Sequence, residues 1–243
     1  MKRRYTFVVN WKMEKSFSKE LKFSANNYDD FISLADKTAT EIILCPSHLS
    51  IYPISKIFLN TPITVGAQVC SGHASGKFAG QISAQSLNEA GCTHAFVGHL
   101  EHLQEQNDSV PQQVQQLLSH GVTPIICVNN EVKHGSIVDT VRERLEFAAS
   151  LSKAVSSHEH VYIAYDLAAT QDPAPIDHIE NVVSCIAKLA PKAFPHQKAK
   201  ILYGRGVTPE SIGNLKKINA LGGFLVGKCG LNFQDFKKVV ESK

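Results

Sequence analysis

The 243-residue sequence has no large excess of charge of either sign and no long hydrophobic run. Its 25 Lys and Arg residues against 22 Asp and Glu residues give a formal net charge of +3. A charge this small argues against a nucleic acid or an anionic membrane surface as partner. The apolar run after the basic start of the chain stops at Asn10, too short for a signal peptide, and no stretch approaches transmembrane length. We therefore expect a cytoplasmic protein.

Paired cysteines and common metal motifs are also missing. The six cysteines include no CxxC pair, and the eleven histidines include no HExxH spacing. Cys45 and Cys127 end apolar runs, where cysteine acts as a small hydrophobic residue. We therefore expect neither disulfides nor a metal site, and no motif indicates a redox cofactor.

What the chain does have is a series of short apolar runs. These runs are continuous and rich in Val and Ile, which is typical of parallel strands covered on both faces. The eight candidate strands are residues 5–10, 40–45, 62–67, 94–98, 122–128, 161–165, 200–204 and 223–227.

Several segments between these runs carry helix signals, such as an opening Ser or Thr and a closing Gly. They are residues 83–91, 109–121, 136–151 and 208–219. In the last segment, Thr208 is the expected N-cap and Pro209 the expected first helical residue. The spacing therefore predicts a helix over 208–219.

Strand–helix alternation repeated eight times in a chain of this length predicts a (β/α)8 TIM barrel. The rival is a doubly wound open sheet, which would favour a GxGxxG turn after the first strand, whereas "VVNWKMEKS" (8–16) follows there. No linker or shift in composition divides the chain. We therefore expect a single barrel domain over residues 1–243.

Polar residues follow three of the candidate strands. Asn10 and Lys12 follow the first, His99 and Glu101 the fourth, and Asp166 the sixth. Taken singly, the lysine can be a solvated side chain, the histidine a helix cap and the aspartate a turn residue. In a barrel, however, the C-terminal strand ends meet at the active-site mouth. An ammonium, an imidazole and a carboxylate there suit proton transfer next to a carbonyl.

Glycine-rich turns follow the last two candidate strands, in "YGRG" (203–206) and "VGKCG" (226–230). Singly, these are ordinary loop glycines. In this fold, the same two turns commonly bind phosphate through accessible backbone N–H groups. The candidate substrate-binding residues of these turns are Gly204, Arg205, Gly206, Gly227 and Lys228.

Eight segments carry a family resemblance over nearly the whole chain, with Asn-x-Lys after the first strand and Gly-His-x-Glu after the fourth as its most specific parts. They are "VVNWKM" (8–13), "VGAQ" (65–68), "GKFAGQIS" (76–83), "VGHLE" (97–101), "GVTPIICV" (121–128), "AYD" (164–166), "YGRGVTPES" (203–211) and "GGFLVG" (222–227). With them the sequence resembles the triosephosphate isomerase family. The resemblance implies interconversion of dihydroxyacetone phosphate and glyceraldehyde 3-phosphate through an enediol.

The resemblance also implies roles for the polar residues. Lys12 would polarise the substrate carbonyl, and Asn10 and Glu101 would support it. His99 would act as a neutral imidazole, as in the known case of pKa tuning in this family. Asp166 stands where the family has its glutamate base.

Several departures from the family pattern bear on activity. Asp166 is one methylene shorter than glutamate, and a misplacement of ~1 Å can cost ~10²-fold in rate, so we expect a slow enzyme. The segment "LAATQDPAP" (167–175) lacks the hinge and glycine of the family's lid.

Further departures lie around the site. Leu100 and His102 replace a serine and an arginine, and "VNNE" (128–131) departs from the family's Gly-Glu. Arg205 and Lys228 replace glycines, so their charges either bind or block the phosphate.

The loop at 70–82 is the part that the resemblance assigns to a dimer interface. Gln81 replaces a glutamate there, and His102 replaces the arginine that pairs with it. Because both charges are missing together, no ion is left unpaired, and we expect a homodimer through this loop.

Three functions stay open from the sequence. They are a slow triosephosphate isomerase, an isomerase of another sugar phosphate, and a non-catalytic paralogue kept for binding or structure. A Schiff-base aldolase is disfavoured because the sixth candidate strand, "VYIAYD" (161–166), contains no lysine.

Overall fold

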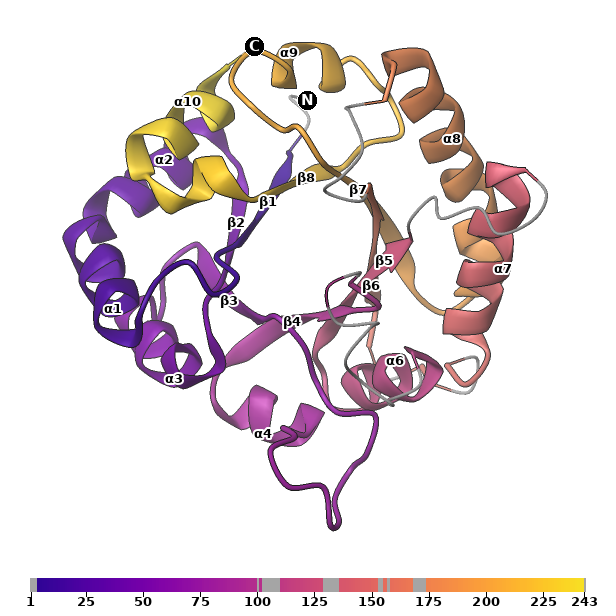
Figure 1. The fold of residues 1–243 in the computed structure, drawn as a ribbon, viewed down its shortest axis with the longest axis horizontal. Coiled ribbons are helices and arrows are strands. Elements are labelled where there is room, and N and C mark those ends of the chain that lie inside the picture. Colours follow the sequence, from indigo (N-terminus) through magenta and orange to yellow (C-terminus); the bar gives the residue numbers. More distant parts are fainter. Residues whose placement is uncertain are drawn as a thin grey trace.

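The computed structural model describes residues 4–99, 101, 110–128, 136–152, 155–156, 158–167 and 174–242. Eight parallel strands form one closed barrel in chain order, with helices around it, as Figure 1 shows. The strands are β1 (Thr6–Asn10), β2 (Glu41–Cys45), β3 (Ile63–Ala67), β4 (Cys92–Val97), β5 (Thr123–Val128), β6 (His160–Asp166), β7 (Lys198–Gly204) and β8 (Gly223–Val226). The predicted (β/α)8 barrel is confirmed, and each predicted strand overlaps an observed one.

The helices of the described residues lie outside the barrel. They are α1 (Phe17–Asn26), α2 (Tyr28–Thr38), α3 (His48–Ile57), α4 (Ala84–Glu89), α6 (Val110–Ser119), α7 (Ile137–Ala149), α8 (Ile176–Ala193), α9 (Ile212–Leu215), α10 (Phe233–Glu241) and the 3-10 helix η1 (Lys228–Leu231). The N-caps of α4 and α7, Ser83 and Ser136, each accept a hydrogen bond from the backbone three residues on. The helices predicted over 83–91, 109–121 and 136–151 are thus confirmed as α4, α6 and α7.

The helix predicted over 208–219 is confirmed only in part. The α-helix there is only α9, and its N-cap position is Ser211. Thr208 and Ser211 bond each other's backbone N–H groups through their hydroxyls, at 3.3 and 3.0 Å. Together with the hydrogen bond from the Ile212 N–H to the Thr208 carbonyl at 3.0 Å, these bonds are the capping pattern expected of Thr208, although the continuous α-helix begins only at Ile212.

The structure has two apolar clusters, one inside the barrel and one between the barrel and the surrounding helices. Val8, Ile43, Phe96, Ile125 and Leu202 fill the interior and are all fully or nearly fully buried. Alternate residues of the same strands pack outward against the helices. Burial on both faces explains why the strands appear in the sequence as unbroken apolar runs.

A polar network closes the N-terminal end of the barrel. Glu41 accepts hydrogen bonds from Thr6 (2.6 Å), Lys200 (2.8 Å) and Tyr162 (3.0 Å), and lies 3.9 Å from His94. Burial alone would raise the pKa of Glu41, but hydrogen bonds from Lys200 and Thr6 and the charge of Lys200 outweigh it and lower the pKa to about 2. The network joins five strands, β1, β2, β4, β6 and β7, at the end that serves stability in this fold.

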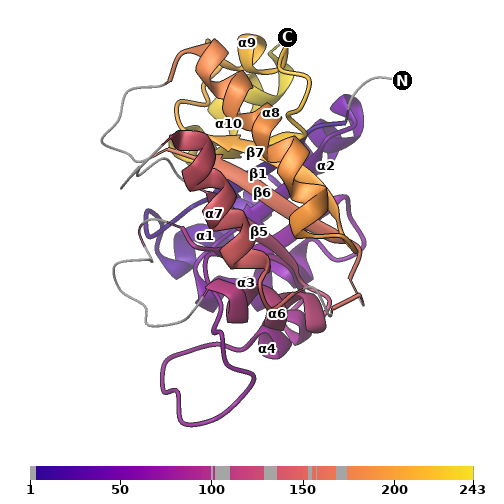
Figure 2. The ribbon, with the colours of Figure 1, turned by 90° about the vertical axis from the view of Figure 1, so that its right-hand side faces the viewer.

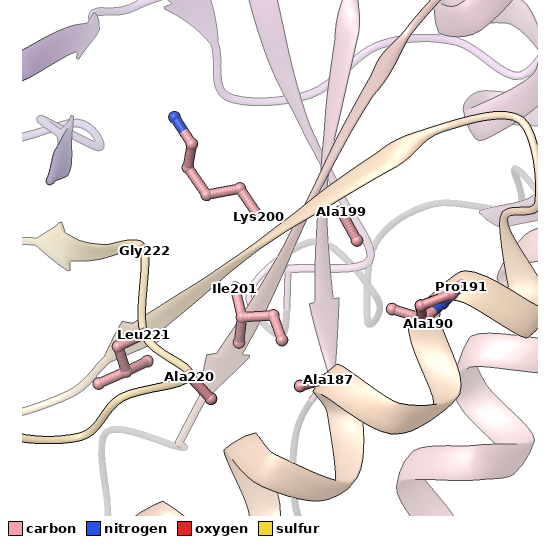
Figure 3. Close-up of a pocket in the computed structure, with 9 residues that line it drawn as sticks. All are labelled: Ala187, Ala190, Pro191, Ala199, Lys200, Ile201, Ala220, Leu221 and Gly222. Carbon is pink, nitrogen blue, oxygen red and sulfur yellow. The ribbon is translucent and has the colours of Figure 1, made fainter. Parts of the chain in front are cut away.

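Two further features lie away from the C-terminal strand ends. A crevice of about 270 Å³ separates α8 from the N-terminal part of β7 and residues 220–222, and Figure 3 shows its small apolar side chains, including Ala187 and Ala190. The loop between β3 and α4 projects from the body of the barrel (Figures 1 and 2). Among the described helices, none combines the length and apolar character needed to span a membrane.

Candidate active site

Three side chains from separate strands meet at the C-terminal end of the barrel. Nε2 of His99 lies 3.5 Å from Oδ2 of Asp166. The ammonium of Lys12 forms an ion pair with the carboxylate of Glu101, two residues beyond the histidine. The charge of Lys12 also acts on Asp166, so the structure brings together the cation, the imidazole and the carboxylate that the sequence placed at the C-terminal ends of strands one, four and six.

Asp166 is the last residue of β6 and faces Gly204 across the sheet. A Cβ atom on Gly204 would lie 2.6 Å from Oδ1 of Asp166, so the carboxylate occupies space that only glycine leaves open. Burial raises the pKa of Asp166 to about 6; the charges of Lys12 and Arg205 partly oppose the increase, and that of Glu101 adds to it. A carboxylate with this acidity suits a general base near neutral pH.

The side chain of His99 is buried, and the backbone of the turn after β4 forms a hydrogen bond with its ring. Its Nδ1 accepts a hydrogen bond from the backbone N–H of Glu101 at 3.4 Å. In a neutral imidazole, an accepting Nδ1 leaves the proton on Nε2. Because Nε2 is the atom that faces Asp166, the ring can offer a proton where the carboxylate accepts one.

Lys12 occupies a strained turn after β1. Its φ is +50°, a left-handed conformation that is uncommon for a residue with a long side chain. Its backbone N–H donates to Oδ1 of Asn10 at 3.0 Å, and its carbonyl accepts from Nε2 of Gln68 at 2.9 Å. Gln68 also donates to the carbonyl of Cys45, so it holds the turn against β2.

The positioning role of Gln68 is absent from the sequence-based prediction. Its signal was a polar residue directly after the apolar run of β3, which is the same signal that identified Asn10 and Asp166.

The two glycine-containing turns lie beside each other because β7 pairs with β8. Arg205 and Gly206 both have positive φ, +88° and +61°, and the hydroxyl of Ser211 donates to the carbonyl of Gly206 at 2.6 Å. Gly227 precedes η1, whose first residue is Lys228, and a Cβ on Gly227 would meet nothing within 4 Å. The two turns therefore offer backbone groups and two cations at the same rim.

Some predicted departures from the family lie outside the described residues. They are Leu100, His102, residues 129–131 and residues 168–173 of the segment expected to replace the lid. Within the described parts of the chain, no cluster of three or more His, Cys, Asp or Glu side chains is arranged to hold a metal ion.

The fold and the three convergent groups define a barrel of the kind that carries out acid–base chemistry on small molecules. A family model described as triosephosphate isomerase matches residues 5–243. The triosephosphate isomerase of Wolbachia pipientis wMel is 31% identical over 244 residues, covering 98% of this chain and 93% of that protein. That of Aquifex aeolicus is 30% identical over 251 residues, covering 98% and 99%. The solved structure of triosephosphate isomerase from Bartonella henselae has a TM-score of 0.80 at 24% identity, covering 99% of this chain and 100% of that one, which shows the shared fold.

The chain belongs to the triosephosphate isomerase family. The resemblance drawn from the sequence segments is thereby confirmed, as is membership of a family of isomerases.

Proposed function

We propose that this protein interconverts dihydroxyacetone phosphate and glyceraldehyde 3-phosphate. The observation that supports it best is the 3.5 Å approach of His99 Nε2 to Asp166 Oδ2 at a mouth that also holds the Lys12 ammonium. A base, a proton donor and a cation are what an enediol route requires.

Each group has one part in the proposed reaction. Asp166 removes a proton from the substrate carbon next to the carbonyl and returns it to the neighbouring carbon. His99 donates its Nε2 proton to the developing enediolate oxygen and takes a proton from the other oxygen, so the net change is isomerisation alone. Lys12 stabilises the negative charge that grows on oxygen. Asn10 and Glu101 hold Lys12.

The phosphate of the substrate would bind at the turns after β7 and β8. Gly206 and Gly227 are exposed and leave backbone groups accessible, whereas Gly204 is buried against Asp166. Arg205 and Lys228 add side-chain charge to the same two turns. These two cations also support a second candidate, an isomerase for a different sugar phosphate, since they alter the anion-binding surface.

A coupled isomerase assay tests the proposal. Purified wild type should turn over triose phosphates slowly, and Asp166→Asn should remove the activity. Asp36→Asn, which makes the same chemical change on an exposed position of α2, is the matched control and should retain it. Absence of turnover at high enzyme concentration would contradict the proposal and favour either another sugar phosphate or a non-catalytic paralogue. Thermal-shift screening with tetrose and pentose phosphates then separates these two.

We also propose that the loop at 70–82 forms a homodimer interface. Phe78 in this loop remains 40% exposed and stacks on His73, with ring centroids 3.7 Å apart. The hydroxyl of Ser71 donates to Gln81 at 2.6 Å, which fixes the base of the loop without an ion pair. Light scattering should give a dimer for wild type and a monomer for Phe78→Glu; a monomeric wild type would refute the interface. We further propose a cytoplasmic location and a single barrel domain over residues 1–243.

A further inference from the structure

Lys15 joins the segment after β1, which carries Lys12, to the segment after β8. Its ammonium donates a hydrogen bond of 2.7 Å to the carbonyl of Leu231, the last residue of η1. The last carbonyls of a helix have no partner within the helix, and a lysine side chain is suited to bind them. η1 also lies close against β1, since a Cβ on Gly230 would lie 2.2 Å from Cγ1 of Val9. The Lys15 bond thus connects two segments that are 216 residues apart in the chain.

Two aromatic rings restrict where the Lys15 ammonium can lie. The ammonium is 4.7 Å from the ring centroid of Phe23 on α1 and 5.7 Å from that of Trp11. The two rings pack edge to face with their centroids 5.4 Å apart, and Trp11 is fully buried. Because a cation is attracted to an aromatic face, these rings hold the ammonium beside η1.

Lys15 directly follows the turn in which Lys12 has its positive φ. The backbone N–H of Glu14 donates to the carbonyl of Trp11 at 3.2 Å, so residues 11–14 form this turn. Backbone strain of the kind found at Lys12 persists only where surrounding contacts enforce it. The contacts that hold the turn therefore also decide where the Lys12 side chain starts.

These contacts come from both sides of β1, which pairs with β2 and with β8. On the β2 side, Gln68 donates to the carbonyls of Lys12 and Cys45. On the β8 side, Lys15 donates to η1. A turn that is held from two sides can keep a conformation that its own residue disfavours.

We propose that Lys15 is a positioning residue of the active site: it holds the turn after β1 against η1 and thereby keeps the Lys12 ammonium in place at the barrel mouth. This inference rests on the proposed function, which gives Lys12 its part in the reaction. A charge stabilises a transition state only from a fixed position, and small misplacements of a catalytic group are costly. Lys15 acts through Lys12 and does not itself touch the substrate.

Two substitutions of Lys15 and one control variant test the proposal. Lys15→Met removes the donor and the charge but keeps a flexible apolar stem, whereas Lys15→Arg keeps both the donor and the charge. Lys216→Met is the matched control. The ammonium of Lys216 donates to two carbonyls at the C-terminal end of α10 and lies 5.8 and 5.9 Å from the ring centroids of Tyr5 and Phe7, near the N-terminal end of β1. It makes the same kinds of contact as Lys15 at the opposite end of the barrel.

Backbone hydrogen exchange measures the turn without any reaction. In Lys15→Met, the N–H groups of Lys12 and Glu14, both hydrogen-bonded within residues 10–14, should exchange about tenfold or more faster than in wild type, because the turn opens locally. Their exchange should stay at the wild-type rate in Lys15→Arg and in Lys216→Met. Wild-type exchange rates at both groups in Lys15→Met would overturn the proposal.

Steady-state kinetics measure the effect on Lys12. In Lys15→Met, kcat should fall by about fivefold or more with KM little changed, because the charge of Lys12 acts mainly on the transition state. Lys15→Arg should restore most of the wild-type kcat, and Lys216→Met should keep it whatever its loss of Tm. A wild-type kcat in Lys15→Met, or the same loss in Lys15→Arg or Lys216→Met, would refute the positioning role. Unfolding of Lys15→Met would show that the lysine serves the whole fold and would likewise contradict the proposal.

The two measurements separate this inference from the proposed function. Faster exchange of the turn in Lys15→Met, in a protein whose wild type has no isomerase activity, would refute the proposed reaction and support the contact of Lys15 with η1 as what holds the turn. Isomerase activity in wild type, with unchanged exchange and unchanged kcat in Lys15→Met, would refute the role of Lys15 alone.

Discussion

Oδ1 of Asp166 lies 2.6 Å from the point where a side chain on Gly204 would begin. The carboxylate at the end of β6 therefore keeps its place because the facing residue of β7 has no side chain. This relationship links the glycine turn and the candidate base in one packing arrangement.

A side chain in the space beside Gly204 should lower the catalytic rate. In Gly204→Ala, the new Cβ would meet Oδ1 of Asp166 at 2.6 Å and Cδ1 of Leu225 at 3.0 Å, so the carboxylate must move. We expect kcat to fall by about tenfold or more, since displacements near 1 Å cost on the order of 10²-fold. Gly227→Ala is the control in the neighbouring turn, where the new Cβ would meet nothing within 4 Å, and its loss should be smaller. Equal losses in the two variants would exclude the packing explanation.

Lengthening the base should raise the rate. Asp166→Glu restores the methylene that this chain lacks relative to its family, and we expect kcat/KM to increase by up to about 10²-fold. Steady-state kinetics at pH 8 check this, with Asp36→Glu as the matched exposed change. An unchanged or lower rate would show that reach is not what limits the enzyme.

The pH dependence of the rate should follow Asp166. Burial raises the pKa of this carboxyl to about 6, and a base must be ionised to accept a proton. The kcat/KM of the free enzyme should therefore increase with pH up to about 6 and level off above it. A profile that is flat between pH 5 and 7 would indicate that Asp166 is not the base.

Burial of the Asp166 carboxylate should also lower the free energy of unfolding at high pH. The folded-state pKa of Asp166 is about 6 against an ordinary value of 3.8, so ionising it disfavours the folded state by about 3 kcal/mol at high pH. This penalty is absent below about pH 4 and develops as the pH rises to about 6. Asp166→Asn should consequently raise the free energy of unfolding at pH 8 by up to this amount and leave it little changed at pH 4. Urea denaturation at the two pH values checks the difference.

Glu41 should show the opposite pH dependence. Its pKa is lowered from 4.5 to about 2 by its bonds to Lys200 and Thr6, which overcome the effect of burial, so its contribution is complete above about pH 4.5 and is lost as the pH falls toward 2. Glu41→Gln should reduce the free energy of unfolding at pH 7 by about 3 kcal/mol. The isomerase activity of the folded variant should stay at the wild-type level, because the network lies at the opposite end of the barrel. A wild-type free energy of unfolding for Glu41→Gln at pH 7 would show that the network does not stabilise the fold.

The sequence by itself determined the barrel and the strand ends that carry polar groups. Continuous Val- and Ile-rich runs can be buried only between two covered faces, and their polar terminal residues must then lie at one rim. That is why Lys12, His99 and Asp166 were identifiable from their positions after three separate runs. The helix predicted over 208–219 is shorter in the structure: Thr208 and Ser211 form the expected capping bonds, but the α-helix covers only Ile212–Leu215.

Only the tertiary structure decided how these groups act on one another. The pairing of His99 with Asp166, the space at Gly204 and the support of Lys12 by Gln68 all join residues from different strands. The pKa of Asp166 depends on burial and on charges from Lys12, Glu101 and Arg205, which are far apart in the chain. Desolvation and Coulomb forces depend on distance in space, so they became defined only when the barrel closed and brought these side chains together.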